Sequence, residues 1–282
     1  MIKVDNISFS YTSKPFIENM SFSVAKGEIF GFLGPSGAGK STLQKILTGL
    51  ILNYTGSATV GDTEVKHRRN SFYENIGVDF EFPSLYEKLS ARQNLEFFGS
   101  LYTKAIRKTD TLLEAVGLHN DGNKKVGEFS KGMKSRLNFI KALIHNPDIL
   151  FLDEPTSGLD PANARTMKNI ILEEKRRGTT VILTTHNMQD ATELCDRVAF
   201  IVDGKIKALD SPHRLIMSKG AVKLVYSYIE NGSERTSECF LKETAQDKKL
   251  GELIKTGKIL TIHSCEPTLS DIFMQVTGRE LE

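Results

Sequence analysis

The stretch GPSGAGKST, residues 34–42, combines glycines, a lysine and hydroxyl side chains at the spacing of a phosphate-binding loop. Glycines allow backbone N–H groups to approach phosphate oxygens, and the positive end of a helix that follows favours the negative charge. We expect Lys40 to reach the β- and γ-phosphates of a nucleotide and the Ser41 hydroxyl to coordinate Mg²⁺. The candidate nucleotide-binding residues of this loop are Gly34, Pro35, Ser36, Gly37, Ala38, Gly39, Lys40, Ser41 and Thr42.

Two acidic residues supply the carboxylates that such a loop needs for hydrolysis. Asp153 and Glu154 end the apolar run ILFLDE. We expect Asp153 to hold Mg²⁺ directly or through water, and Glu154 to act as a general base by polarising a water aimed at the γ-phosphate. Paired acids at the end of a strand are often only solvated. Together with the loop at residues 34–42, however, they predict a site that hydrolyses a nucleotide.

Apolar runs and helical periodicities around these residues predict an α/β fold. The run EIFGFL precedes the loop, and apolar residues at helical spacing follow it from Lys40 to Gly49, so the order is strand, loop, helix. An ordinary glycine-rich turn is the alternative interpretation of the loop, and this context disfavours it. Three further runs, DILFLDE, TTVILTTH and VAFIVDG, alternate with helical stretches. The alternation predicts a mainly parallel sheet that is covered on both faces.

Two other segments predict additions to this core. Residues 1–30 contain short alternating runs with turn formers between them, which indicates an N-terminal antiparallel β subdomain. A mostly helical insert is expected at about residues 84–145. It is opened by Ser90, with Gln93 three residues later at the spacing of a capping box.

The last part of the chain predicts a small separate domain. After residue 220 the pattern changes to that of a hairpin with a turn at Asn231 and Gly232. We therefore expect two domains, a catalytic one at residues 1–220 and a small C-terminal α+β extension at residues 221–282.

Composition limits the partners and compartments that the protein can have. The chain has 37 Lys and Arg against 35 Asp and Glu, and its densest basic patch, KHRRN at residues 66–70, reads as a solvated loop, so no nucleic-acid partner is expected. Its three cysteines are widely spaced and indicate neither a disulfide framework nor a zinc site. No run resembles a signal peptide or approaches the roughly 18 apolar residues of a membrane-spanning helix. If the protein works at a membrane, we expect another chain to span it.

A serine–glycine motif ahead of the acidic strand connects these features to one family. The segment FSKGMKSRL, residues 129–137, resembles the signature of the nucleotide-binding subunits of ATP-binding cassette (ABC) transporters. It keeps the serine and the second glycine of the common form LSGGQ as Ser130 and Gly132, and it departs from that form at Phe129, Lys131 and Met133. A plain helix N-cap would explain Ser130 alone. The resemblance implies a P-loop NTPase core, in which the signature is a further helix N-terminus that grips a γ-phosphate.

Other positions match motifs of this family in the expected order. The resemblance implies that Tyr11 stacks on the adenine ring, that His186 contacts the γ-phosphate and steadies the attacking water, and that residues 157–160 cross a dimer interface and place Asp160 near the nucleotide. Glu81 stands where many relatives have a glutamine that senses Mg²⁺. Its carboxylate could reach the metal through water, but it adds negative charge near the phosphates.

The resemblance also implies cofactors and partners. ATP and Mg²⁺ are the expected cofactors. Two copies of the chain, or this chain and a related one, would pair head to tail, so that Ser130 and Gly132 of one close over ATP held by Lys40 of the other. A separate membrane-spanning permease subunit would dock around residues 82–89 and hold the protein at the cytoplasmic face of the membrane. Exposed side chains at Phe82, Leu85 or Tyr86 would support this; the alternative is that they belong to the core.

The expected function is ATP hydrolysis that powers export of a drug, antibiotic, peptide, lipid or ion. The segment EPTLSDIFMQVTGRE resembles the ending of bacterial multidrug and antibiotic exporters of this family. Three alternatives remain: a soluble ABC ATPase that acts on the ribosome or DNA, a nucleotide-dependent regulatory module with little hydrolysis, and an importer. The near-neutral charge disfavours the soluble ATPase, and the C-terminal ending disfavours the importer. The regulatory module is disfavoured by the intact set of Lys40, Asp153, Glu154 and His186.

Overall fold

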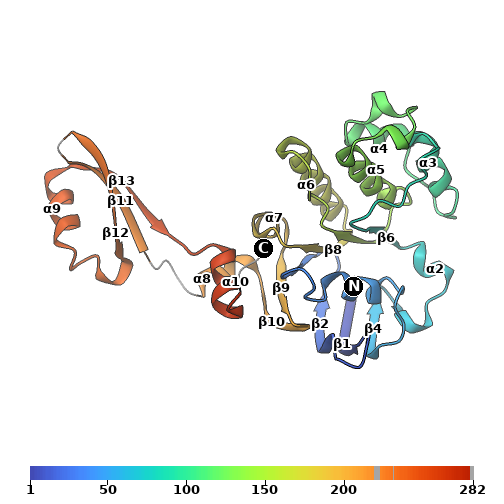
Figure 1. The fold of residues 1–282 in the computed structure, drawn as a ribbon, viewed down its shortest axis with the longest axis horizontal. Helices are drawn as coiled ribbons and strands as arrows, with labels where there is room; N and C mark the ends of the chain where they lie inside the picture. Colours follow the sequence, from blue (N-terminus) through green and yellow to red (C-terminus); the bar gives the residue numbers. More distant parts are fainter. Residues whose placement is uncertain (219–222, 231, 280–282) are drawn as a thin grey trace. The chain divides into compact units, whose positions relative to one another are not determined.

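The computed structural model describes residues 1–218, 223–230 and 232–279 (Figure 1). The chain divides into two compact units, Met1–Leu209 and a second unit that begins at Asp210. The domain boundary expected between residues 220 and 221 lies outside the described residues. In the described residues the first unit contains two sheets and the second contains one, and the residues with candidate chemistry belong to the first unit.

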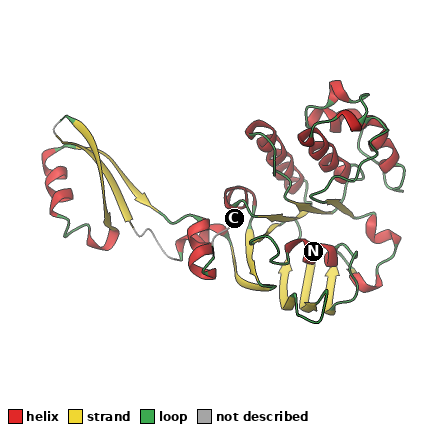
Figure 2. Ribbon diagram, in the orientation of Figure 1, coloured by secondary structure: helices red, strands yellow, loops and turns green. Residues whose placement is uncertain are grey.

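A six-stranded sheet forms the centre of the first unit (Figure 2). Its strand order is β10-β9-β3-β8-β7-β6, and its strands are β3 (Ile29–Leu33), β6 (Ile76–Asp79), β7 (Ile149–Asp153), β8 (Thr180–Thr185), β9 (Arg197–Val202) and β10 (Lys205–Asp210). β3 pairs in parallel with β8 and β9, and β7 pairs in parallel with β6 and β8. The mainly parallel sheet predicted from the apolar runs is therefore confirmed. The edge strand β10 was not predicted, because its residues are only exposed or half-buried and form no apolar run.

A second, antiparallel sheet and the first helix cover one face of this central sheet. The antiparallel sheet has the order β2-β1-β4-β5, with bounds β1 (Ile2–Phe9), β2 (Ile17–Val24), β4 (Thr55–Val60) and β5 (Thr63–Glu64). Helix α1 (Lys40–Leu47) follows the glycine loop, as predicted. Phe30 and Phe32 of β3 pack in one hydrophobic cluster with Leu43 and Ile46 of α1 and with the apolar side of β1 and β2. This cluster is the core that fixes the start of α1 against the end of β3.

Helices cover the other face of the central sheet. They include α6 (Pro161–Arg176), which contacts β8, and α7 (Met188–Leu194), which contacts β3 and β8. Gly31 of β3 faces this side, where a Cβ atom would lie only 2.7 Å from Sγ of Cys195. Close packing of α7 on the sheet therefore depends on the absence of a side chain at this position, and both faces of the sheet are buried, as expected.

The helical insert between β6 and β7 is present. Its helices are α3 (Ala91–Gly99), α4 (Thr109–Ala115) and α5 (Lys131–Leu143), with 3₁₀ turns η2 (His119–Asp121) and η3 (Val126–Glu128). The capping box at the start of α3 is confirmed, because Ser90 Oγ accepts from Gln93 N–H at 3.1 Å and Gln93 Oε1 accepts from Ser90 N–H at 2.9 Å. Helix α5 packs against β6. The link from β5 to β6 contains η1 (Val65–His67) and α2 (Asn70–Tyr73).

The second unit contains a three-stranded antiparallel sheet of order β12-β11-β13. Its elements are α8 (Pro212–Met217), β11 (Lys223–Glu230), β12 (Ser233–Phe240), η4 (Leu241–Glu243), α9 (Lys248–Thr256), β13 (Ile259–Cys265) and α10 (Leu269–Thr277). Tyr226 and Tyr228 of β11 pack against Leu250 and Leu253 of α9. The predicted hairpin is present as β11 and β12. Of its predicted turn, Asn231 lies outside the described residues and Gly232 has a φ of +74°.

A buried ion pair joins the insert to α6 and makes the first unit sensitive to one substitution. Arg107, just before α4, donates two hydrogen bonds to the carboxylate of Glu174, at 2.7 and 2.5 Å, and Glu174 is only 1% exposed. We expect Arg107→Met to lower the free energy of unfolding by about 3 kcal/mol, because it leaves a buried carboxylate without this partner. Urea unfolding followed by circular dichroism would measure the change.

A matched control is Arg177→Met. Arg177 also contacts Glu174, at 3.3 Å, but its side chain is 52% exposed. Exposed ion pairs contribute about 1 kcal/mol or less. Equal losses for the two variants would contradict the role assigned to the buried pair.

Candidate active site

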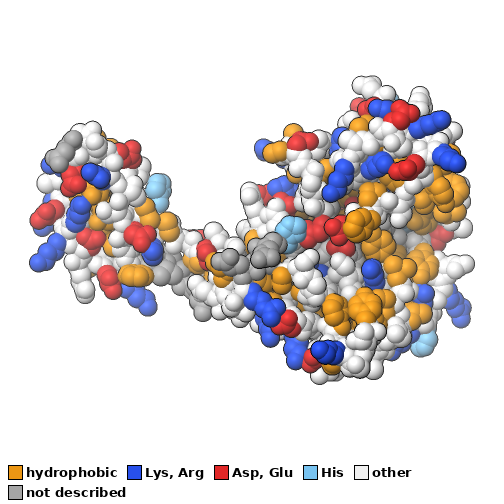
Figure 3. All heavy atoms as spheres, viewed as in Figure 1, with side chains coloured by type: hydrophobic (Ala, Val, Ile, Leu, Met, Phe, Trp, Pro, Cys, Tyr) orange, Lys and Arg blue, Asp and Glu red, His pale blue; other side chains and the backbone are white. Residues whose placement is uncertain are grey.

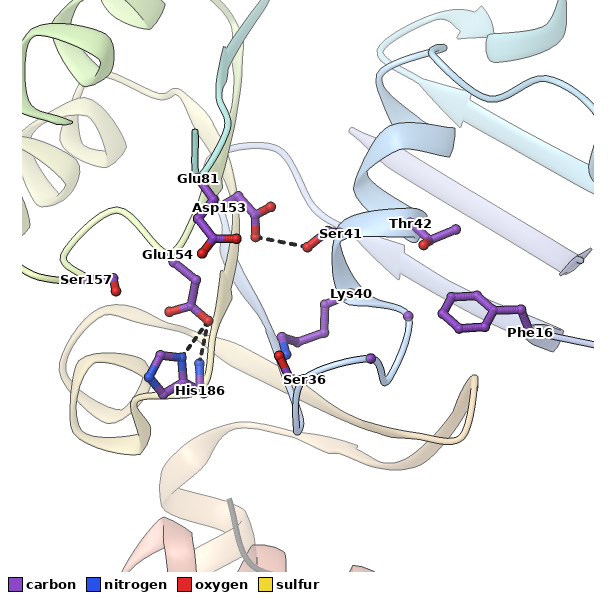
Figure 4. A pocket seen from close by; sticks show the side chains of 12 residues that line it. Phe16, Ser36, Lys40, Ser41, Thr42, Glu81, Asp153, Glu154, Ser157 and His186 are labelled. Atoms are coloured by element: carbon purple, nitrogen blue, oxygen red, sulfur yellow. Dashed lines mark hydrogen bonds and ion pairs between the residues drawn. The ribbon is translucent and has the colours of Figure 1, made fainter. Parts of the chain in front are cut away.

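A pocket of about 320 Å³ collects most of the residues that the sequence singled out (Figure 4). It lies where β7 and β8 end and where the glycine loop after β3 leads into α1. The predicted residues that line it are Ser36, Gly37, Gly39, Lys40, Ser41, Thr42, Glu81, Asp153, Glu154 and His186. Residues far apart in the chain therefore meet at one edge of the sheet, as the carboxyl ends of parallel strands require.

The glycine loop has a backbone that other residues would not permit. A Cβ atom at Gly34 would lie 2.1 Å from the carbonyl oxygen of Ile201 in β9. Gly39 has a φ of +108° and is the N-cap of α1. Gly34, Pro35 and Ala38 belong to this loop without lining the pocket. The turn thus directs the positive end of α1 into the pocket, which is the arrangement that binds phosphate.

Lys40 is a buried cation within this loop. Its Nζ donates to the carbonyl oxygens of Gly34 at 2.6 Å and Pro35 at 3.0 Å. Burial lowers the pKa of Lys40, and the negative charges of nearby Glu154, Asp153 and Glu81 oppose that shift. Figure 4 shows these three carboxylates across the pocket from Lys40. A phosphate group placed between Lys40 and the three carboxylates would be attracted by the lysine and repelled by the acids. A cation between the phosphate and the carboxylates would remove this repulsion.

Two oxygen-bearing side chains fit such a cation. Ser41 Oγ donates to Asp153 Oδ1 at 3.3 Å, and Thr184 Oγ1 donates to the same oxygen. A serine hydroxyl and a carboxylate are the kind of donors that Mg²⁺ accepts, with phosphate and water oxygens filling the other positions. Among the residues that the structure describes, no three His, Cys, Asp or Glu side chains form a metal cluster. Ser41 and Asp153 therefore fit a magnesium ion whose other ligands come from phosphate and water.

Glu154 is held in a fixed orientation by the end of β8. Its Oε1 lies 2.8 Å from Nδ1 of His186 and accepts from the His186 backbone N–H at 2.9 Å, and its Oε2 accepts from Thr185 Oγ1 at 3.1 Å. Glu154 also has a φ of +52°, which is unusual for a residue other than glycine. A strained backbone and three partners keep this carboxylate in the pocket, where it can accept a proton from a bound water.

Phe16 is a pocket residue that sequence reasoning missed. It lines the pocket, whereas Tyr11 stands beside it with a distance of 5.3 Å between the two ring centroids. Tyr11 is 58% exposed, and its hydroxyl lies 2.9 Å from Thr42 Oγ1. The signal in the sequence that could have found Phe16 is that it is an aromatic residue directly before β2. Phe16 therefore forms an aromatic edge of the pocket, and the ring of Tyr11 packs against it.

Three other predicted residues lie outside this pocket. Ser130 is the N-cap of α5, where its Oγ accepts from Met133 N–H at 3.2 Å, and Gly132 follows in the first turn. Asp160 is the N-cap of α6 and accepts from the backbone of Ala162 and Asn163. Backbone hydrogen bonds hold the pKa of Asp160 below its usual value. Ser157, from the same predicted interface loop as Asp160, lines the pocket.

The sequence and the fold are similar to those of known transport ATPases. The ABC transporter family model matches residues 17–157. A fluoroquinolones export ATP-binding protein of Mycobacterium tuberculosis is 48% identical over all of this chain and 94% of its own length. Nod factor export ATP-binding protein I of Rhizobium sp. (strain N33) is 36% identical over all of this chain and 98% of its own.

A solved structure supports the same assignment. The ATP-binding subunit of an ABC transporter superposes with a TM-score of 0.71 at 26% identity and covers 78% of this chain and 93% of its own. None of the helices in the described ranges is both long and apolar enough to cross a bilayer. The chain therefore belongs to the ABC transporter family, as an ATP-binding subunit with ATPase activity.

Proposed function

We propose that this chain binds Mg²⁺ with ATP and powers export through a separate membrane-spanning chain, at the cytoplasmic face of the membrane. The observation that carries the proposal is the placement of Glu154, oriented by His186 and Thr185, across the pocket from Lys40. The two relatives described above, which align over 94% and 98% of their own length, are named for export, and this supports that direction of transport.

Six of the residues that line the pocket have a part in the proposed chemistry. Lys40 and the N–H groups at the start of α1 hold the phosphates. Ser41 and Asp153 would hold the magnesium ion, which would neutralise charge on the phosphate oxygens. Glu154 takes the proton of the attacking water, and His186 keeps the Glu154 carboxylate in place. Glu81, which lines the same pocket, would contact the metal through water.

The active unit in our proposal is a head-to-tail dimer, made of two copies of this chain or of this chain and a related one. Ser130 and Gly132 do not line the pocket that holds Lys40. The N-terminus of α5 nevertheless offers N–H groups of the kind that bind phosphate. In the dimer this helix closes over ATP bound to the partner, and the loop with Ser157 and Asp160 lies at the interface. ATP would then favour the closed dimer, and loss of the γ-phosphate would let it open.

The membrane-spanning partner is proposed to dock on the loop between β6 and α3. Phe82 is 78% exposed and Tyr86 is 51% exposed, while Leu85 is partly buried. Figure 3 shows hydrophobic side chains gathered on the viewed face of the first unit. Large apolar side chains that face water in this way are typical of surfaces that bind another protein.

The substitution Glu154→Gln tests the hydrolytic role. Because glutamine keeps the shape but cannot accept the proton, we expect kcat for ATP to fall by about 100-fold or more, with ATP affinity retained. The variant should also accumulate as an ATP-bound dimer in size-exclusion chromatography. A variant that turned over at the parent rate would remove Glu154 from the role of general base.

A comparison of Tyr11→Ala with Phe16→Ala tests which ring carries the adenine. If Tyr11 stacks on the base, Tyr11→Ala should raise the Kd for ATP by about tenfold, since stacking of a base on an aromatic ring contributes roughly 1–3 kcal/mol. Tyr11→Phe, which keeps the ring, is the control and should bind as the parent does. Weaker binding in Phe16→Ala alone would assign the stacking to Phe16.

The membrane partner can be tested by purification from the source cell. Tagged Glu154→Gln protein is incubated with Mg·ATP and detergent-solubilised membranes, and the bound chains are identified. We expect one multi-spanning membrane protein, and we expect Tyr86→Glu in the same background to lose it, because a charge would enter an apolar contact. Recovery of ribosomes or nucleic acid without a membrane protein would favour the soluble alternative instead.

A further inference from the structure

The loop that carries Glu81 is hydrogen-bonded to two side chains of helix α5, Asn138 and Lys141. This loop, residues 80–84, directly follows β6. It brings Glu81 to the pocket beside Asp153 and Glu154, while Phe82 is exposed. Residues 80–84 form no helix or strand. Something other than secondary structure must therefore hold Glu81 at its place in the pocket.

Asn138, in the middle of α5, binds this loop at both ends. It is 2% exposed. Its Nδ2 donates to the Asp79 carboxylate and to the Phe80 carbonyl oxygen at 3.3 Å, and its Oδ1 accepts from Ser84 N–H at 3.3 Å. A single amide thus connects the end of β6, the start of the loop and the end of the loop.

Lys141, one turn further along α5, also binds the end of this loop and contacts Asn138. Its Nζ donates to the Ser84 carbonyl oxygen at 3.0 Å and to Asn138 Oδ1 at 2.7 Å. The ammonium also lies 4.8 Å from the centre of the Phe98 ring in α3. Ser84 is therefore held by both its N–H and its C=O, through two residues of one helix.

Burial makes this arrangement costly, which argues for a role beyond stability. Asp79 is 4% exposed, so its carboxyl group has lost most of its contact with water. Apolar side chains of similar size would often fill such a space at least as stably. A buried polar group with directional hydrogen bonds does, however, specify one position of the backbone that it binds.

The same side chain adjoins the reacting groups. A small cavity is lined by Asn138 together with Glu81, Asp153 and Glu154. A shift of the loop that lengthened the contacts of Asn138 would therefore change the position of Glu81 relative to the other two carboxylates.

We propose that Asn138 and Lys141 are positioning residues that set the place of Glu81 in the active site. This inference rests on the proposed role of Glu81 near the metal. Because both residues belong to α5, which begins at the cap Ser130, they also tie the position of Glu81 to that of the signature helix.

Two substitutions test the proposal in the purified full-length chain. Asn138→Leu removes four hydrogen bonds at similar volume. Lys141→Met keeps most of the stem beside Phe98 but removes the donors. We expect each to lower kcat by about tenfold and to raise the Mg²⁺ concentration for half-maximal rate, with KM for ATP changed less than about twofold, as for groups that orient a metal ligand. Lys141→Arg retains donors and should recover most of the rate.

Asn94→Leu is the matched control. Asn94 is a fully buried asparagine of α3, and its side chain donates to the carbonyl oxygens of Tyr86 and Ser90 and accepts from Tyr86 N–H. Asn94 binds residues between the loop of Glu81 and α3, and not the loop itself. We expect it to lower the free energy of unfolding as Asn138→Leu does, but to leave the basal kcat and the Mg²⁺ dependence unchanged.

A double-mutant cycle identifies the residue through which Asn138 acts. In a Glu81→Ala background, Asn138→Leu should cause no further loss of kcat, because contributions that pass through one group are not additive. The proposal is overturned if the two losses add, if Glu81→Ala leaves kcat unchanged while Asn138→Leu lowers it, or if folded Asn138→Leu and Lys141→Met keep the parent kcat. If Asn138→Leu does not fold, the same cycle with Lys141→Met decides. The proposed hydrolytic function is tested separately by Glu154→Gln, so the two can fail independently.

Discussion

A buried lysine that faces three carboxylates is the interaction on which the rest of this structure depends. Charges taken out of water are stable only when partners are placed to compensate them, and the place of each partner must then be exact to a fraction of an ångström. Lys40 lies in a turn that glycine alone permits, and Glu81, Asp153 and Glu154 come from two other segments. The fold has to bring these segments together while it leaves room for a phosphate group and a metal between them.

The parallel sheet meets this requirement because its strands all end at one edge. β3 delivers the glycine loop, β7 delivers Asp153 and Glu154, and β8 delivers the residues that orient Glu154. The core of phenylalanines and α1 side chains beneath the loop keeps the helix N-terminus aimed at the site. Packing and chemistry are thus coupled, since the same strands that bury the core end in the proposed catalytic groups.

Helix α5 connects two parts of the chemistry that lie in different places. Its first turn carries the cap Ser130, which in our proposal serves the partner's nucleotide. Its middle carries Asn138 and Lys141, which hold the loop of Glu81 in the pocket of its own chain. The loop of Glu81 also bears Phe82, the most exposed large apolar residue of the chain that the structure describes. One helix therefore borders the proposed dimer contact, the proposed metal site and the proposed membrane contact.

The sequence by itself determined the parts of this protein whose signals are local. A fixed spacing of glycine, lysine and serine predicted the phosphate loop, alternating apolar runs predicted the parallel sheet, and a serine three residues before a glutamine predicted the cap of α3. Each of these depends on neighbours within a few residues, so the pattern is visible in the letters. The tertiary structure alone decided that Phe16 lines the pocket and that Asn138 binds the Asp79 carboxylate 59 positions earlier in the chain. Such contacts leave no periodic pattern in the sequence. The one between Asn138 and Asp79 forms only because the packing of α5 on β6 brings these two side chains within hydrogen-bond distance.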